Sequence, residues 1–508
     1  MRKDYFLVLA MASALLLAGC AGSPLRSYDS ELKETVGLVR TGALDQALTH
    51  LEKNNKPVFD SDAPAQKDGQ PKEKTVLDSV NGKDILYYLE KGELLSLKKE
   101  YEKSRASWLM ADEIVRSWED EFRTNSTKLI GDVGSFLVSD RVRRYDGQDY
   151  EKVFLSAKLT MGHILMGNFD HARVEMKKTY EREKLIESYR EKEYEALKEE
   201  QGKQTQVVKA DLKDLSAKGY PLDELDAPEV RELKNGFQNA FAHYLAGYFF
   251  EVTGEYSLAE PGYRNALALQ PNSRLIKSKV GNVGKNKAGP NETDVLFVVE
   301  SGFAPAWKSV TIPLPIPVNG RVVATPLSFP VVKAEGKSFM PTSLKAGGKE
   351  VEVETLVNVD AMARRLLKDQ LPGIMGRTVV RAVAKSAAQY QLQKNAGPVA
   401  GLLAGAASVV TEQADERAWR TLPERLAVAR AILPRGTVPI EFQTGAGSYK
   451  TEITVGNRVT VIPVRLASGA VYVGQPQVEV YADAFPDEPV KPAKPAKVTK
   501  GGRTGKSK

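Results

Sequence analysis

Ala240–Asn272 has the sequence AFAHYLAGYFFEVTGEYSLAEPGYRNALALQPN, and this stretch decides the fold of the N-terminal half. Two runs of mainly apolar and aromatic residues are separated by Gly254, and Pro271 follows the second run. Glycine commonly ends a helix and proline stops one, so the stretch predicts two helices joined by a tight turn. Small residues at Gly247 and Ala259 would let the two helices touch, and the aromatic side chains would fill the space between neighbouring helix pairs.

The same stretch resembles a tetratricopeptide (TPR) repeat. Eight positions fit that pattern: Gly247, Phe250, Gly254, Tyr256, Ala259, Tyr263, Ala266 and Pro271. Three weaker copies precede it, in TGALDQALTHL, YLEKGELLSLKKEYEKSRASWLMA and MGNFDHARVEM. The second helix of each copy is predicted to begin at Leu44, Tyr101, Phe169 and Tyr256. These residues are 57, 68 and 87 positions apart, whereas an uninterrupted array would give about 34. We therefore expect an irregular TPR-like solenoid with inserts.

The second half has a different character. Residues 277–293 are rich in Lys, Gly and Asn, which is typical of a linker. Beyond them, apolar runs predict strands at 294–300, 308–314, 321–325, 328–333, 350–359, 424–432, 437–443, 450–455 and 458–463. Asp360 is expected to cap a helical block. The predicted fold class is α+β: a TPR-like α-solenoid over residues 20–276, then an antiparallel β domain over residues 294–484 with a helical insertion at about 360–420.

The net charge of +7 is concentrated in the last residues of the chain. Residues 485–508 carry seven basic and two acidic side chains among Pro, Ala, Gly and Ser, with no apolar periodicity. This composition predicts a disordered basic tail. The body of the chain is then close to neutral, which argues against a nucleic-acid-binding face.

The first twenty residues predict export and lipidation. Arg2 and Lys3 precede a short apolar stretch that has the layout of a signal peptide over residues 1–19. It ends in Leu17-Ala18-Gly19-Cys20, which resembles the lipobox of bacterial lipoproteins, and Cys20 is the one cysteine of the chain. An ordinary signal peptide with an incidental cysteine is the alternative. The resemblance implies a lipid anchor on Cys20, and Ala21 after it favours the outer membrane, facing the periplasm.

Residue content excludes several kinds of site. A single cysteine cannot form an intramolecular disulfide or a thiolate metal centre. The four histidines are scattered, and no nucleophile elbow, phosphate-binding loop or dinucleotide fingerprint is present. We expect no catalytic, cofactor-binding or metal-binding residues, and therefore no cofactor.

The string Asp415-Glu-Arg417-Ala-Trp419-Arg-Thr-Leu-Pro423 is the most distinctive motif of the second half. Together with the lipobox and the repeats, it resembles a family of uncharacterised bacterial lipoproteins with N-terminal helical repeats and a C-terminal β-rich half. We expect Trp419 to anchor the start of a strand and Arg417 to pair with Asp415 or a carbonyl. The run containing Gly397, Gly401 and Gly405 favours a buried helical hairpin, with contact to a partner or a membrane surface as the alternative.

Two functions agree with this sequence. The first is a non-catalytic, membrane-anchored scaffold or adaptor of the cell envelope, with a protein partner in the TPR groove. The second is an enzyme of cell-wall metabolism, a peptidoglycan hydrolase or transferase. The absence of a catalytic constellation favours the scaffold, and the sequence leaves a small-molecule ligand open.

Overall fold

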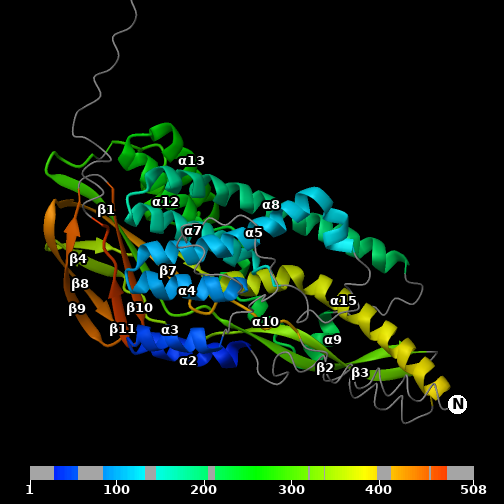
Figure 1. Cartoon of the computed structure of the whole chain (residues 1–508). Helices are drawn as coiled ribbons and strands as arrows, with labels where there is room; N and C mark the ends of the chain where they lie inside the picture. Colours follow the sequence, from blue (N-terminus) through cyan, green and yellow to red (C-terminus); the bar gives the residue numbers. More distant parts are fainter. Residues whose placement is uncertain are drawn as a thin grey trace, which may run out of the picture.

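The computed structural model describes residues 28–54, 84–131, 145–203, 212–285, 287–318, 321–336, 338–396, 414–456 and 459–477. The predicted signal peptide, Cys20, the glycine run at 397–405 and the basic tail lie outside these residues. The fold is α+β, as predicted (Figure 1).

The N-terminal half is built from consecutive helix pairs. In each pair we call the first helix the A helix and the second the B helix. The pairs are α2 (Tyr28–Arg40) with α3 (Leu44–Asn54), α4 (Ile85–Leu97) with α5 (Tyr101–Gly131), α7 (Asp149–Leu165) with α8 (Phe169–Lys203), and α12 (Ala240–Thr253) with α13 (Tyr256–Leu269). Short helices connect the third pair to the fourth and follow it: α9 (Leu212–Ala217), α10 (Leu222–Leu225), α11 (Pro228–Arg231) and α14 (Arg274–Lys279). Helix α14 therefore occupies the start of the segment predicted as a linker.

All four pairs turn in the same way. Two residues before each B helix the backbone is left-handed, at Gly42, Lys99, Gly167 and Gly254, with φ between 64° and 88°. The next residue donates its N–H to the carbonyl five residues back, as Glu255 does to Phe250 at 2.7 Å. This is the Schellman arrangement, which satisfies carbonyls that the ending helix leaves free. The B helices begin at Leu44, Tyr101, Phe169 and Tyr256, so the four predicted starts are confirmed.

Small residues bring the two helices of a pair together. The residue three positions into each B helix is almost fully buried in every pair, at Ala47, Ser104, Ala172 and Ala259. In the fourth pair the backbones themselves meet, since a Cβ added at Gly262 would lie 2.7 Å from the backbone nitrogen of Gly247. A Cβ at Gly247 would lie 2.8 Å from the ring of Tyr263. Neither position can hold a larger residue unless the two helices separate.

Two sheets form the body of the C-terminal half. The central sheet has the order β11-β10-β1-β7-β6 and the outer sheet the order β5-β4-β8-β9. The central strands are β1 (Glu292–Ser301), β6 (Glu354–Asn358), β7 (Arg425–Pro434), β10 (Thr460–Ala467) and β11 (Ala470–Val473); the outer strands are β4 (Ser343–Ala346), β5 (Lys349–Glu352), β8 (Gly436–Thr444) and β9 (Gly447–Val455). Strands β4 and β11 were not predicted. The expectation of a purely antiparallel domain is wrong for one pair, because β1 and β10 run parallel.

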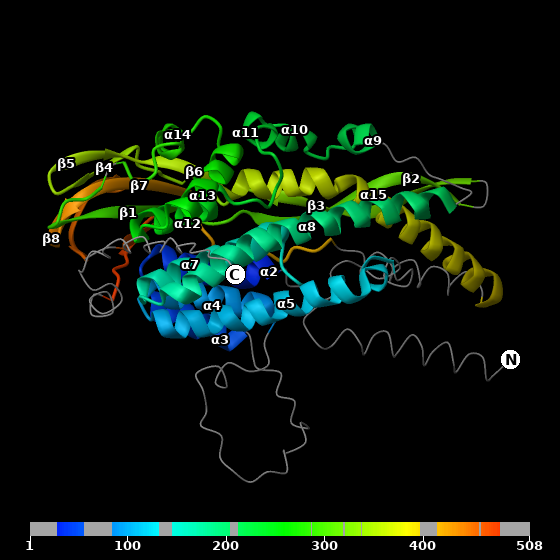
Figure 2. The ribbon, with the colours of Figure 1, turned by 90° about the horizontal axis from the view of Figure 1, so that it is seen from above.

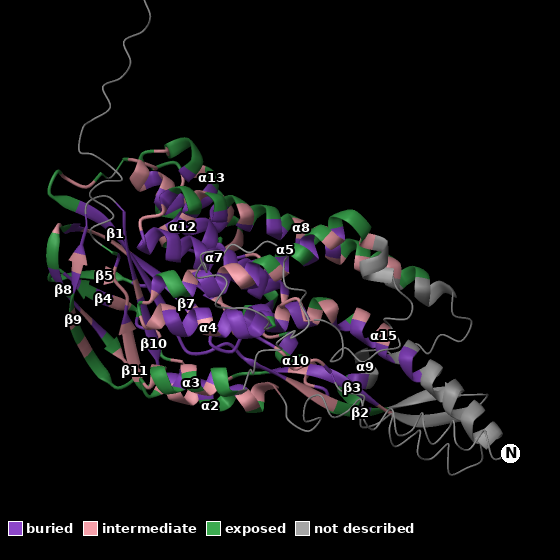
Figure 3. Ribbon diagram, in the orientation of Figure 1, coloured by how far each residue is buried: buried purple, intermediate pink, exposed green. Residues whose placement is uncertain are grey.

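The central sheet is buried on both faces. Along β1, Val295 and Phe297 pack against the outer sheet, whereas Leu296 and Val298 belong to a core shared with the helices. The molecule therefore has three layers, with the helices on one side of the central sheet and the outer sheet on the other (Figures 1 and 3). One hydrophobic core runs from α2 through the A helices into the central sheet. The predicted boundary between the halves thus does not separate two cores.

A long two-stranded ribbon projects from this body. Strands β2 (Ala306–Val318) and β3 (Arg321–Lys333) pair antiparallel along their whole length, where the sequence predicted two strands in place of β3. Helix α15 (Val359–Ala396) packs on its proximal half, and both extend to the same end of the molecule (Figure 2). The predicted helical insertion is wrong at its end, because residues 414–420 form no helix.

The close approach in the fourth helix pair yields a stability prediction. Gly262→Ala should destabilise the chain by about 1–3 kcal/mol, because the new Cβ collides with the backbone of α12. In the control, Gly37→Ala in α2 meets open space and should be neutral or stabilising by up to about 1 kcal/mol. Urea unfolding of the full chain measures both. Equal stability of the two variants would contradict the packing described here.

Candidate functional site

The motif at 415–423 lies in the middle of the molecule. Residues Ala414–Glu424, which we call the strap, connect the α15 side of the molecule to β7 and run between the A helices and the central sheet. Ala418, Trp419 and Leu422 have no exposed surface, and Arg420 is 2% exposed. We call the surface of the A helices that faces the central sheet the A-helix face. The strap covers this face here.

Two carboxylates of the A helices hold the backbone of the strap. Glu90 of α4 accepts the N–H of Arg420 at 2.6 Å on Oε1, and on Oε2 it accepts the N–H and hydroxyl of Thr421 at 3.0 and 2.5 Å. Glu151 of α7 accepts the N–H of Trp419 at 2.6 Å. Three consecutive backbone donors of an irregular segment are thereby satisfied inside the protein, where an unpaired donor would cost about 1–3 kcal/mol.

Arg420 links three parts of the chain. Its Nε donates to Asp29, in the first turn of α2, at 3.0 Å. Its other nitrogens donate to the carbonyl of Ala304 and to Glu335. A planar guanidinium has five donors in fixed directions, so one side chain can join the first helix, the segment after β1 and the segment after β3.

The expected pairing of Arg417 with Asp415 is confirmed, and Trp419 is buried in the strap ahead of β7. The Trp419 ring packs edge-on against Trp108 of α5, with ring centroids 6.4 Å apart, just before β7 begins. Arg417 pairs with Asp415 through contacts of 2.6 and 2.8 Å. Both residues fix the course of the strap, which is a structural role.

A second buried cluster joins the A helices directly to the central sheet. Lys158 of α7 donates to Glu93 of α4 at 3.0 Å and to Glu300 of β1 at 2.7 Å. Arg465 of β10 lies beside both carboxylates and donates to the carbonyls of Gly302 and Thr421 at 2.8 Å. Two acids face two bases, so the charges in this buried place compensate one another.

Burial changes the proton affinity of the carboxyls that hold the strap. Removal from water raises the pKa of Glu90 and of Glu151 to about 7, against the opposing effect of the hydrogen bonds that they accept. A carboxyl with such a pKa can act as a general acid near neutral pH. Here, however, both oxygens of each carboxyl are already engaged by donors of the chain.

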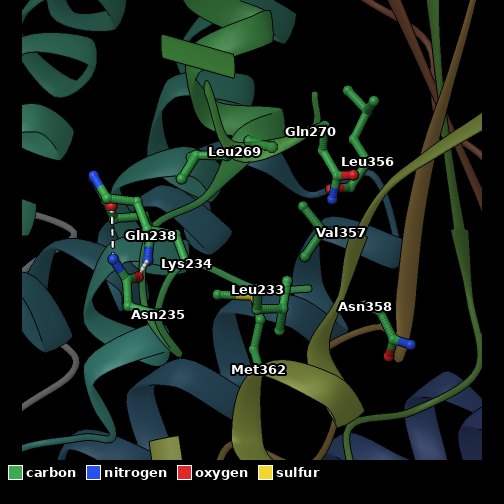
Figure 4. Close-up of a pocket in the computed structure, with 11 residues that line it drawn as sticks. Leu233, Lys234, Asn235, Gln238, Leu269, Gln270, Leu356, Val357, Asn358 and Met362 are labelled. Atoms are coloured by element: carbon green, nitrogen blue, oxygen red, sulfur yellow. Dashed lines mark hydrogen bonds between the residues drawn. The ribbon is translucent and has the colours of Figure 1, made fainter. Parts of the chain in front are cut away.

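Elsewhere in the described residues, the candidates for a ligand or metal site are weaker. A shallow pocket lies between the segment before α12, the end of α13, β6 and the start of α15 (Figure 4), lined by Leu233, Lys234, Asn235, Gln238, Ala240, Leu269, Gln270, Leu356, Val357, Asn358 and Met362. Asn235 donates to Gln238 at 2.7 Å and Gln270 to the carbonyl of Leu356 at 2.9 Å, so these amides are committed to protein partners. Among the described residues, no three His, Cys, Asp or Glu side chains are placed to hold a metal ion.

The sequence predicted one modified residue, Cys20, and it lies outside the described residues. It did not predict the buried acids Glu90, Glu93 and Glu151 or the buried base Lys158. The sequence does contain a signal for these buried charged residues. The helices ILYYLEKGELLSL and DYEKVFLSAKLTMGHIL place charged residues among apolar ones. Because charged residues are rarely buried unless they are paired, such positions indicate buried interactions.

Comparison with known proteins gives no relative from which a function could be transferred: no family model, curated protein or solved structure matches this chain. Within the part of the chain that the structure describes, no helix combines the length and apolar character of a membrane span.

Removal of the Glu90 carboxylate tests the attachment of the strap. Glu90→Ala should destabilise the chain by about 3–5 kcal/mol, because it leaves two adjacent backbone donors and a hydroxyl buried without an acceptor. Glu102→Ala removes a 57% exposed carboxylate of α5 and should change stability by no more than about 0.5 kcal/mol. Urea unfolding compares the two, and similar losses would contradict the role assigned to Glu90.

The raised pKa values also predict how stability depends on pH. The folded chain should bind more protons than the unfolded chain between about pH 4.5 and 7, because Glu90 and Glu151 ionise near 7 only when folded. The contribution of these two groups to the free energy of unfolding is fully present below about pH 4.5 and is lost as the pH rises through about 7. The loss is at most about 3 kcal/mol for each group. Melting temperatures near pH 5 and near pH 8 should differ less in Glu90→Gln/Glu151→Gln than in wild type. If the difference in melting temperature were the same in the variant and in wild type, Glu90 and Glu151 would not be the source of the pH dependence.

Proposed function

We propose that this chain is a non-catalytic, lipid-anchored scaffold of the bacterial cell envelope, in which the helix pairs form an irregular TPR-like solenoid. The observation that supports it best is the repeated geometry of the four pairs: the same left-handed turn, the same Schellman bond and a buried small residue at the same place. Arrays of helix pairs of this kind commonly present extended surfaces for protein binding.

The partner is proposed to bind away from the A-helix face. A groove was expected to hold a partner segment, but the A-helix face is covered by the strap and the central sheet, where Tyr248 of α12 also donates to the carbonyls of Asp294 and Thr460. The B helices α5 and α8 are the long ones, with 31 and 35 residues, and they extend along the outside of the molecule (Figure 2). On α8, Tyr180 and Tyr194 are 45% and 53% exposed. Tyrosine is enriched in protein interfaces, so we place the partner on this helix.

The strap geometry argues against the enzymatic alternative. A hydrolase needs a carboxyl that reaches its substrate, yet Glu90 and Glu151 are almost completely buried and hold the backbone of the strap. A long polymer such as peptidoglycan would have to displace Trp419 to reach either group. The buried acids are therefore better explained as parts of the attachment between the halves.

The anchor and the location are proposed from the lipobox. A diacylglyceryl group on Cys20, with a further acyl chain on its amine, would hold the mature chain at a bilayer, because several acyl chains give stable anchoring. The outer membrane facing the periplasm is the proposed site. Membership of the family of bacterial lipoproteins with helical repeats and a β-rich half is proposed on the same basis.

Photo-crosslinking in intact cells tests this function. A photoreactive residue in place of Tyr194, in the full chain, should give a discrete adduct with a protein partner. The same substitution combined with Cys20→Ser should give an unprocessed precursor that takes up no labelled fatty acid and loses the adduct, because only the lipid-anchored chain reaches the partner.

The control places the photoreactive residue at Lys450 of β9, whose side chain is 72% exposed, and no adduct with another protein is expected there. Equal adducts from both positions, or none from either, would contradict a partner on α8. Normal maturation of the Cys20→Ser chain would contradict the anchor. Clearing of purified cell wall in a zymogram would instead favour the enzyme.

A further inference from the structure

Strand β9 forms a long edge of the outer sheet. The order β5-β4-β8-β9 places β5 and β9 at the two edges, and β9 lies at the end of the molecule away from the far end of α15 (Figure 1). Strand β5 has four residues, whereas β9 has nine, in unbroken register with β8 from Gly447 to Val455. These nine residues contain neither a proline nor a bulge, the usual devices that stop an edge strand from pairing with another chain.

The backbone shows which residues of β9 point outward. The carbonyl of Glu452 accepts the side-chain amide of Gln475 at 3.3 Å, so it points away from β8. Along an antiparallel strand, residues that bond to the neighbour alternate with residues that point away from it. Ser448, Lys450 and Thr454 are in the same phase as Glu452 and therefore also direct their N–H and C=O groups outward. This edge offers donors and acceptors to a further strand.

The charges on the outer face of this sheet form a row that stops at the same edge. Glu350 of β5 pairs with Lys345 of β4, which in turn pairs with Glu441 of β8. Glu441 then pairs with Lys450 of β9, and the Lys450 Nζ lies 3.4 Å from the Glu441 carboxylate. Opposite charges stabilise facing positions on neighbouring strands, whereas like charges destabilise them. The alternating row ends in a cation, so a further strand should supply an acid beside Lys450.

Strand β9 of a second copy supplies that acid. If two β9 strands pair antiparallel about a two-fold axis at Thr451, Lys450 faces Glu452 of the second copy, and Glu452 faces its Lys450. The outward-pointing Ser448 and Thr454 also face each other in this register. A two-fold axis at Lys450 would instead oppose two ammonium groups, and an axis at Glu452 would oppose two carboxylates. The charges of β9 thus select one register for pairing with itself.

We propose that the edge of β9 joins two copies of this chain into a symmetric dimer, in which the two outer sheets become one continuous sheet. The same edge serves both copies, as a two-fold interface requires. The proposal depends neither on the lipid anchor nor on the partner of α8. One strand per copy gives a small contact and hence a weak dimer, so cross-linking is the suitable measurement.

A cysteine at the two-fold axis tests the register. Thr451→Cys in the purified, detergent-solubilised full chain should give a disulfide-linked dimer on mild oxidation. Directly facing residues at non-hydrogen-bonded positions have Cα atoms about 4.5 Å apart, within the range of a disulfide. The matched control, Ser448→Cys, lies on the same edge and is more exposed. Its two copies would lie about six residues apart along the strands, roughly 20 Å, and should not link. The wild-type chain reveals any link through Cys20.

Exchange of charge tests the recognition. In the Thr451→Cys chain, Lys450→Glu gives like charges at both central pairs, and Glu452→Lys does the same with the opposite sign. Each change should lower the yield of linked dimer about tenfold or more. When the two variants are oxidised together, opposite charges face each other again at both pairs, and a mixed dimer should form at the original yield. An unfolded variant could not recover in this way.

Several results would overturn the proposal. These are no dimer from Thr451→Cys, equal linking of Ser448→Cys, an unchanged yield after both charge changes, or no recovery in the mixture. Lys349→Glu, which reverses an exposed charge on β5 at the other edge of the sheet, is the control for the charge changes and should leave the yield of linked dimer unchanged. An equal loss in this control would also contradict recognition through β9.

Discussion

The structure depends on a strand with no free face. Strand β1 is buried along almost its whole length, and its side chains alternate between the outer sheet and the helices. A strand buried on one side only would allow the helix pairs to form a separate unit. Because both faces of β1 are committed, the A helices need the sheet to cover their apolar side chains. The helical and β-rich halves thus fold as one body, although their sequences have the composition of two domains.

Buried charges determine how the layers align within that body. Apolar packing alone would allow the helices to slide over the sheet, since it has little directional preference. Lys158 between Glu93 and Glu300, and Arg430 between Glu251 and Asp294, hold α7 and α12 at defined positions on β1. Ion pairs of this kind cost desolvation and add little net stability. Their contribution here is the alignment of α7 and α12 along β1.

Local signals in the sequence predicted a large part of this fold. The starts of the B helices followed from alignment with the TPR pattern, which located Tyr101 even though the left-handed residue before it is Lys99 and not a glycine. Most strands followed from apolar runs. The parallel pairing of β1 with β10 was missed, because it joins segments that lie far apart in the chain. The strands β4 and β11 were missed although each pairs with its neighbour in the chain, since both are only four residues long. The course of the strap was also missed, because it is held by Glu90 and Glu151, which no local pattern connects to residues 414–424.

Asp29 and Arg420 are in contact but lie far apart in the sequence, and this separation has a consequence for biosynthesis. These residues are 391 positions apart, so at about 5–20 residues per second a ribosome needs roughly 20–80 s to make the second after the first. During that interval the A helices lack the strap, whose backbone N–H groups bind Glu90 and Glu151 and which covers both residues. A chain that stops before the strap would leave the carboxylates of Glu90 and Glu151 without these donors. The A-helix face can therefore be covered only after most of the polypeptide has been made.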